Sequence, residues 1–282
     1  PRIRGRMMGF VTSGNNFGSV IAIPVCAVLI TTVGWRLTFV VLAMGLLAFV
    51  VLAILVIRDT DEDVRKEQNK RWAPSESDSR QQLNASEGLT VPEALRTSAF
   101  WFLVAGMTLQ QFVRTGVSSQ LVPHLQQVGL SLASATGAMM LLGFFGMSSK
   151  IIFGRISETI TARLAYVVIM ILQIAGLTGM IFSGGSTAVW VALCVFGLGT
   201  GGVGALMPLV ITDMFGLKQF GSIMGLTQMG IILPIVAGPL MAGMIFDSTG
   251  GYNLMFGITI GLLVVSIGAF MMTKSPLRST TS

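Results

Sequence analysis

Polar side chains recur at helical spacing within one apolar stretch, so that on a helix they form a single stripe. The members of this stripe are Gln110, Gln111, Arg114 and Ser118. The next apolar stretch carries a second cation, Lys150. A cation deep in a membrane helix costs about 2.5–3.5 kcal/mol on insertion scales, and such residues generally face a water-filled path or a ligand. We therefore take Lys150, Arg114, Gln110 and Gln111 as candidate binding residues for an anion.

Lys150 also has a structural interpretation. Its stem is long enough to snorkel toward the inner surface, because Arg155 marks the helix end about 7 Å away at the usual helical rise. The apolar stretches hold no acidic residue in their interiors, since Glu158 and Asp213 fall at their ends. Two cations without an internal counter-charge form a place for an anion, unless carboxylates elsewhere pair with them.

Asn15 is a further candidate, in the first apolar stretch. Gly14 and Gly18 stand four residues apart, and this spacing opens one helix face for close packing. Asn15 lies near that face. Its amide either makes interhelical hydrogen bonds or lines a polar cavity, and the sequence leaves both open.

Composition identifies the class of protein that must position these residues. Apolar residues make up 52% of the chain and charged residues only 11%, whereas soluble domains have about 25% charged residues. The single His124, with no clustered Cys, Asp or Glu, argues against a metal site, and no nucleophile–base pair suggests an enzyme. The net charge of +6 fits cytoplasmic loops better than a nucleic-acid surface. We expect an all-α polytopic membrane protein without a cofactor.

Hydrophobic stretches long enough to cross a bilayer number eight. They are residues 7–32, 36–57, 98–122, 132–153, 163–183, 187–212, 219–246 and 252–273. Basic residues gather in alternate connections, and the other connections hold only Arg36. The positive-inside rule therefore places both ends of this chain in the cytoplasm, and we expect a plasma (inner) membrane protein.

Residues 58–96 form the only long polar segment and are expected to be a cytoplasmic linker. Near its end, Thr90 and Glu93 make a capping-box pattern that predicts a short helix before Trp101. The chain begins at Pro1 rather than Met, so we expect a fragment of a longer protein.

The order of several short motifs resembles the major facilitator superfamily, in particular its oxalate/formate antiporter and monocarboxylate transporter branch. Arg4-Gly5-Arg6 with Gly34-Trp35-Arg36 is similar to that family's fifth and sixth spans, and Lys150-Ile-Ile-Phe-Gly154 to the end of its eighth. The most specific block runs from Phe196-Gly197 to Gly250-Gly251-Tyr252 and resembles spans ten and eleven. The resemblance implies spans five to twelve of an expected twelve: residues 1–57 as the last two helices of the N-terminal bundle, 58–96 as the linker and 97–282 as the C-terminal six-helix bundle.

The same resemblance implies a secondary carrier that moves a small organic anion by alternating access, with a coupling proton or an exchanged anion as possible partners. The family's cation at the position of Lys150 is usually Arg and is linked to carboxylate substrates. Monocarboxylate members often have Asp where this chain has Gly146. Gly154, Arg155 and Glu158 match a cytoplasmic gating motif. The alternative is a carrier of the same fold for a neutral or cationic solute, in which Lys150 and Arg114 are structural.

Overall fold

The computed structural model describes residues 4–56, 88–182 and 186–273. Within these ranges the regular elements are helices, and strand-type pairing is limited to one isolated bridge between Gly88 and Gly216. The chain divides into two units, residues 20–85 and the remainder, which comprises residues 1–19 and 86–282. The candidate binding residues fall in the second of these, hereafter the bundle unit. The domain limits expected at residues 57 and 96 stay a prediction.

The first helix, α1 (Arg4–Val56), runs through both of the first two predicted stretches. It is interrupted at Gly34, whose φ of 80° and ψ of 162° are not helical. A positive φ is readily adopted only by glycine, which explains why the helix breaks at this residue. Gly34 lies between the predicted stretches 7–32 and 36–57. Only the first part of α1, up to Ser19, belongs to the bundle unit.

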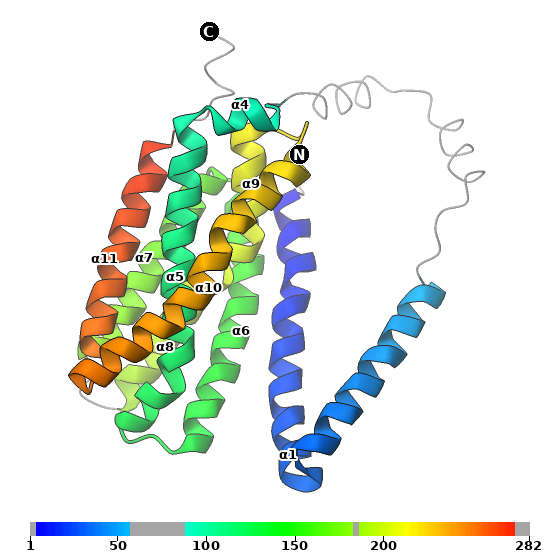
Figure 1. The fold of residues 1–282 in the computed structure, drawn as a ribbon, viewed down its shortest axis with the longest axis vertical. Helices are drawn as coiled ribbons and strands as arrows, with labels where there is room; N and C mark the ends of the chain where they lie inside the picture. Colours follow the sequence, from blue (N-terminus) through cyan, green and yellow to red (C-terminus); the bar gives the residue numbers. More distant parts are fainter. Residues whose placement is uncertain (1–3, 57–87, 183–185, 274–282) are drawn as a thin grey trace. The chain divides into compact units, whose positions relative to one another are not determined.

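Figure 1 shows the long helices of the bundle unit lying side by side after a short helix, α4 (Val91–Leu95). The long helices are α5 (Ser98–Gln127), α6 (Leu132–Ile156), α7 (Ala162–Phe182), α8 (Ser186–Gly201), α9 (Val203–Phe215), α10 (Phe220–Thr249) and α11 (Asn253–Met272). The closest neighbours are α7 with α8, α5 with α10, α6 with α8, and α5 with α11. Buried apolar side chains of α5, α7, α9 and α11 form much of the core.

Six helices in the described ranges are long and apolar enough to cross a membrane. One of the six is Val28–Leu55. Another, Thr187–Phe215, covers both α8 and α9, although the helix is interrupted at Gly202. Two predicted stretches, 7–32 and 98–122, are helical but have no span of their own among the six; Val28–Leu55 overlaps only the end of the first. In α5 the polar stripe, with two glutamines and an arginine, lowers the apolar content. The expected all-helical fold is confirmed, whereas apolar content alone identifies fewer spans than the eight predicted.

Proline and threonine together join α10 to α5. Pro234 lies inside α10 and has no N–H, so the carbonyl of Gly230 loses its helical partner. Thr108 of α5 donates to that carbonyl over 3.3 Å, and Thr115 donates to the carbonyl of Pro234 over 3.0 Å. These bonds satisfy the proline-disrupted stretch of α10 from a neighbouring helix, as is usual in membrane proteins.

Glycines bring α7 and α8 into backbone contact. A Cβ added to Gly176 would lie 2.7 Å from Phe196 Cβ, and one added to Gly199 would lie 2.8 Å from the carbonyl oxygen of Ile169. Small residues at such crossings allow dense van der Waals packing, which drives helix association where lipid removes the hydrophobic contribution. We therefore regard α7 and α8 as a tightly packed pair.

The predicted helix before Trp101 is α4, and the predicted capping box is present at its start. The backbone N–H of Thr90 donates to Glu93 Oε2 over 2.7 Å, and this bond holds the pKa of the Glu93 carboxyl below its ordinary value. The residues just before α4 are tied to the turn between α9 and α10. Leu89 N–H donates to the carbonyl of Phe215 over 2.9 Å, and Val91 N–H donates to Gln219 Oε1 over 2.6 Å.

Candidate functional site

A cavity of about 570 Å³ lies within the bundle unit, between α5, α6, α7, α8, α9 and α10. Much of its wall is apolar, with side chains such as Met107, Leu142 and Phe196. Its polar lining is Gln110, Gln111, Arg114, Ser118, Lys150, Tyr166, Thr200 and Gln228. A cavity whose wall combines apolar side chains with convergent polar groups can bind a small polar molecule.

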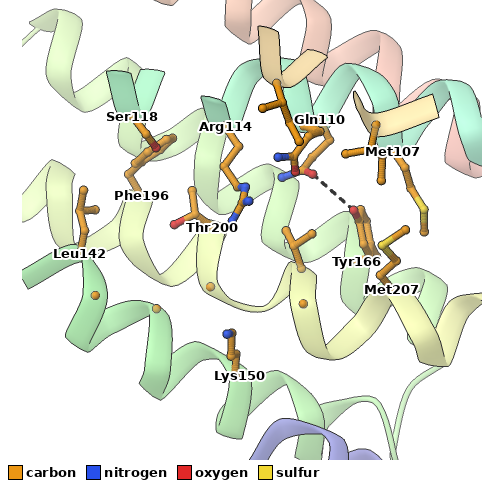
Figure 2. A pocket seen from close by; sticks show the side chains of 18 of the residues that line it. Met107, Gln110, Arg114, Ser118, Leu142, Lys150, Tyr166, Phe196, Thr200 and Met207 are labelled. Atoms are coloured by element: carbon orange, nitrogen blue, oxygen red, sulfur yellow. Dashed lines mark hydrogen bonds between the residues drawn. The ribbon is translucent and has the colours of Figure 1, made fainter. Parts of the chain in front are cut away.

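The predicted stripe on α5 faces this cavity along its full length, because all four of its members line the wall. Gln110 and Gln111 are buried, whereas the side chain of Arg114 is exposed to the cavity. Figure 2 shows Arg114 extending from α5 toward Lys150, which extends from α6 on the opposite side. The two cations predicted as binding residues, Arg114 and Lys150, therefore face each other across the same cavity.

Lys150 is nearly enclosed, with an exposed fraction of 5%. Its Nζ donates to the backbone carbonyl of Thr12 in α1 over 2.7 Å. Glycines make room on two sides: a Cβ at Gly9 would lie 2.5 Å from the Lys150 carbonyl oxygen, and one at Gly204 would touch Lys150 Cε at 3.6 Å. The amine thus reaches a backbone carbonyl and the cavity wall, and it links α6 to α1.

The remaining predicted residues lie elsewhere. The side chain of Asn15 falls outside the described residues. Gly154 is buried in α6, and Arg155 and Glu158 lie at the end of that helix and in the following turn; none of the three lines the cavity. The gating role expected for these three stays a prediction.

The packing role predicted for Gly14 is wrong for the described part of the chain, where no atom comes within 4 Å of a Cβ added there. Gly9, one helical turn and a half earlier, makes the close approach instead, against the backbone of Lys150. The four-residue spacing of glycines predicted a packed face of α1 but not which face meets α6.

Sequence reasoning missed Tyr166, Thr200 and Gln228, which also line the cavity. The hydroxyl of Tyr166 donates to Gln110 Oε1 over 3.4 Å, the bond drawn in Figure 2. A signal for Tyr166 was present: it stands seven residues before Gln173, two helical turns, in a stretch that is otherwise apolar. This pair marks a polar line along α7.

His124, near the end of α5, is buried, with an exposed fraction of 5%. Its ring makes edge contacts with Tyr252 and Phe256, at centroid distances of 5.2 and 4.9 Å. An aromatic pocket between α5 and α11 therefore encloses the imidazole, away from the cavity lining.

Gly146 and Gly201 form the floor of the cavity where α6 crosses α8. A Cβ on Gly201 would collide with the backbone of Gly146. Gly146 is thus packed backbone to backbone against Gly201. Among the described residues, no group of three or more His, Cys, Asp or Glu side chains is placed to hold a metal.

Comparison with known proteins gives low but extensive similarity. The chain is 26% identical over 156 residues to monocarboxylate transporter 2 of Rattus norvegicus, covering 54% of this chain and 32% of that protein. It is 24% identical over 268 residues to monocarboxylate transporter 12 of Homo sapiens, covering 88% and 52%. It is 24% identical over 299 residues to the hexuronate transporter of Bacillus subtilis, covering 98% and 67%. The chain thus spans from about a third to two thirds of the length of these relatives.

A family model agrees with this similarity over most of the chain. The sequence model of the Major Facilitator Superfamily matches residues 1–226, which include α1 through the start of α10. The all-helical architecture, with helices long and apolar enough to cross a membrane, is that of the same class of integral membrane protein. The chain belongs to the Major Facilitator Superfamily.

Proposed function

We propose that this chain forms part of a secondary carrier that moves a small organic anion, a mono- or dicarboxylate, across a membrane. In this proposal the cavity of the bundle unit is the substrate site, and Lys150 and Arg114 bind the anion. Gln110 and Gln111 supply further hydrogen-bond donors beside Arg114. The family match and the relatives named as transporters support a carrier rather than an enzyme.

The observation that supports the proposal is the placement of two cations on opposite walls of one cavity (Figure 2). Two positive groups that face each other in a low-dielectric space repel, and a bound carboxylate relieves that repulsion while accepting charge-assisted hydrogen bonds. The guanidinium of Arg114 also has the planar fork that matches a carboxylate. Relatives named for monocarboxylates and a hexuronate, both carboxylate compounds, agree with this chemistry.

Transport by alternating access follows from the architecture proposed for the family. The anion enters the cavity, the loaded carrier rearranges, and the site then opens to the other side. The bond from Lys150 to Thr12 joins α6 to α1, so a substrate that draws the amine into the cavity weakens a link between these helices. A ligand drives such a change only through different affinity for the two states. The coupling proton or exchanged anion belongs to the same proposal.

The same bond favours one alternative. A lysine held by a backbone carbonyl has a structural role available to it, so a carrier of a neutral or cationic solute would keep Lys150 for packing. Arg114 distinguishes the two proposals, because its side chain is exposed to the cavity rather than enclosed.

The test is uptake into vesicles that contain the full-length protein. Lactate, pyruvate, oxalate and glucuronate form the panel, and each is compared with an uncharged analogue such as its amide or parent sugar. The proposal expects saturable uptake of at least one carboxylate, with its analogue excluded. Uptake of the analogues but of no carboxylate would support the neutral-solute alternative.

A further inference from the structure

A line of buried amides lies behind the cavity wall. Gln173 of α7 is fully enclosed, with an exposed fraction of 0%, and it does not line the cavity. Its Nε2 donates to the carbonyl of Gly199 in α8 over 3.0 Å, and its Oε1 accepts from Gln110 Nε2 over 3.5 Å. Gln110 Oε1 in turn accepts from the Tyr166 hydroxyl over 3.4 Å. One continuous line of hydrogen bonds thus joins α8, α7 and α5 to the cavity.

The Gly199 carbonyl fixes the direction of every bond in this line. A carbonyl can only accept, so the NH₂ end of Gln173 must face it. The oxygen of Gln173 then faces Gln110 and can only accept, so the NH₂ end of Gln110 faces Gln173. The opposite end of Gln110, its oxygen, is left for the Tyr166 hydroxyl. Rotating either amide by half a turn would set two oxygens or two NH₂ groups against each other inside the protein, which is costly.

Both ends of the line are held by packing. Gly199 lies in the tightly packed pair of α7 and α8, where a Cβ would come within 2.7 Å of Gln173 Cγ. The Tyr166 ring stacks on Phe270 of α11, with centroids 4.6 Å apart and planes 9° from parallel. Neither end can turn freely, so the Gly199 carbonyl fixes the orientation of the Gln173 amide, and Gln173 in turn fixes that of the Gln110 amide.

We infer that Gln173 is a specificity-determining positioning residue that orients the Gln110 amide for anion binding, an inference that rests on the proposed function. An amide nitrogen carries two N–H groups, and Gln173 uses one of those on Gln110. The bond to Gln173 leaves the other N–H of Gln110 unused, and Gln110 borders the cavity one turn from Arg114 on the same helix face. In our inference this N–H is the group offered to a carboxylate, which an amide oxygen at the same place would repel.

The experiment uses the full-length protein in vesicles, with the best-transported carboxylate of the panel as the probe. Gln173→Met removes both hydrogen bonds at nearly constant volume and frees the Gln110 amide to turn. We expect KM to rise about three- to tenfold, the loss of roughly one neutral hydrogen bond, with kcat within about twofold of wild type. Gln173→Asn is the second variant: it keeps an amide beside Gly199 but is too short to reach Gln110, and it should raise KM similarly.

Two comparisons separate positioning from stability. In a Gln110→Met background, Gln173→Met should change KM no further, because Gln173 acts through Gln110. Ser266→Ala is the matched control: Ser266 is equally buried and its hydroxyl bonds to the Gly106 carbonyl of α5 over 2.7 Å and to Met170 Sδ, but not to the Gln110 amide. It should lower the melting temperature and leave KM unchanged. An unchanged KM in Gln173→Met and Gln173→Asn, or a further rise in the double variant, would overturn the inference.

A second double-mutant cycle measures melting temperature instead of transport and needs no substrate. Non-additive effects of Gln110→Met and Gln173→Met would establish that the two amides interact. The wild type could take up no carboxylate of the panel while this cycle is non-additive. That result would contradict the proposed function and the role of Gln173 in anion selection, but it would still support the orientation of the two amides. Additive melting temperatures would overturn the orientation itself.

Discussion

Lys150 and Arg114 border the same cavity but differ in their surroundings. Lys150 is enclosed and donates to the Thr12 carbonyl, whereas the Arg114 side chain is exposed to the cavity. Replacement of an enclosed, hydrogen-bonded cation disturbs both packing and binding. Replacement of a cation exposed to a cavity mainly changes what the cavity can bind. The two residues therefore call for different substitutions.

For Lys150 the informative pair is Lys150→Arg and Lys150→Gln. If the amine binds the substrate, Gln should raise KM about ten- to hundredfold, because a hydrogen bond to a charged group contributes roughly 1.5–3 kcal/mol. Arg keeps the charge and should retain most uptake. Vesicle uptake measures both variants. Lys218→Gln is the control, since Lys218 is exposed in the turn between α9 and α10, outside the cavity lining, and should leave KM unchanged. A wild-type KM in Lys150→Gln would remove Lys150 from the site.

For Arg114 the prediction concerns transport without loss of fold. Arg114→Ala should raise KM by about tenfold or more, the effect of a lost charge-assisted bond, while the amount of protein in the membrane stays near wild type. Arg114→Lys should recover part of the affinity, because it restores the charge but not the fork. Uptake and quantitative blotting are measured on the same vesicles. Low expression combined with a normal KM in the surviving protein would indicate a structural arginine instead.

At the level of elements, the floor of the cavity depends on glycine contacts between α6 and α8. The Gly201 backbone lies against that of Gly146, and the helix breaks one residue later, between α8 and α9. Backbone groups cannot move aside as the end of a flexible side chain can. The position of Lys150, one turn beyond Gly146 on α6, follows from this crossing.

Gly201→Ala should therefore destabilise the protein by about 1–3 kcal/mol or more, the range for overpacking, and should lower its melting temperature in detergent. Gly257→Ala in α11 is the control, because no atom lies within 4 Å of a Cβ added there. That variant should melt at or slightly above the wild-type temperature. Equal melting temperatures for the two alanine variants would contradict the close crossing.

Helical spacing was enough to predict that Gln110, Gln111, Arg114 and Ser118 share one face, and all four line one cavity. The helix break near Gly34 and the capping box of α4 could likewise be predicted from the sequence, because both depend on residues close in sequence. The contacts of Lys150 with Thr12 and of Gln173 with Gly199 were not, since they join residues on different helices. Such pairings depend on how helices are rotated against each other, which a stripe on one helix leaves undetermined.

At the scale of the whole molecule, charge predicts the orientation in the membrane. Arg155 and Lys218 belong to one set of connections, and the turn of residues 128–131 belongs to the other and is free of basic residues. The positive-inside rule places the first set in the cytoplasm. Cysteines at Thr159 and Val128, both exposed, should then react with a membrane-impermeant thiol reagent from opposite sides of sealed cells. Labelling of both positions from outside would contradict this orientation.

The contacts of residues 88–91 with the turn between α9 and α10 determine which helices receive a pull on the chain ahead of α4. Leu89 and Val91 are bonded to Phe215 and Gln219 in the turn between α9 and α10, and Gly88 is bridged to Gly216 in the same turn. A pull applied to the chain ahead of Gly88 therefore loads these contacts before it reaches α5. These contacts lie at the end of α9 and the start of α10, and both helices supply part of the cavity wall. Residues 88–91 therefore couple a pull from the N-terminal side to two helices that line the cavity.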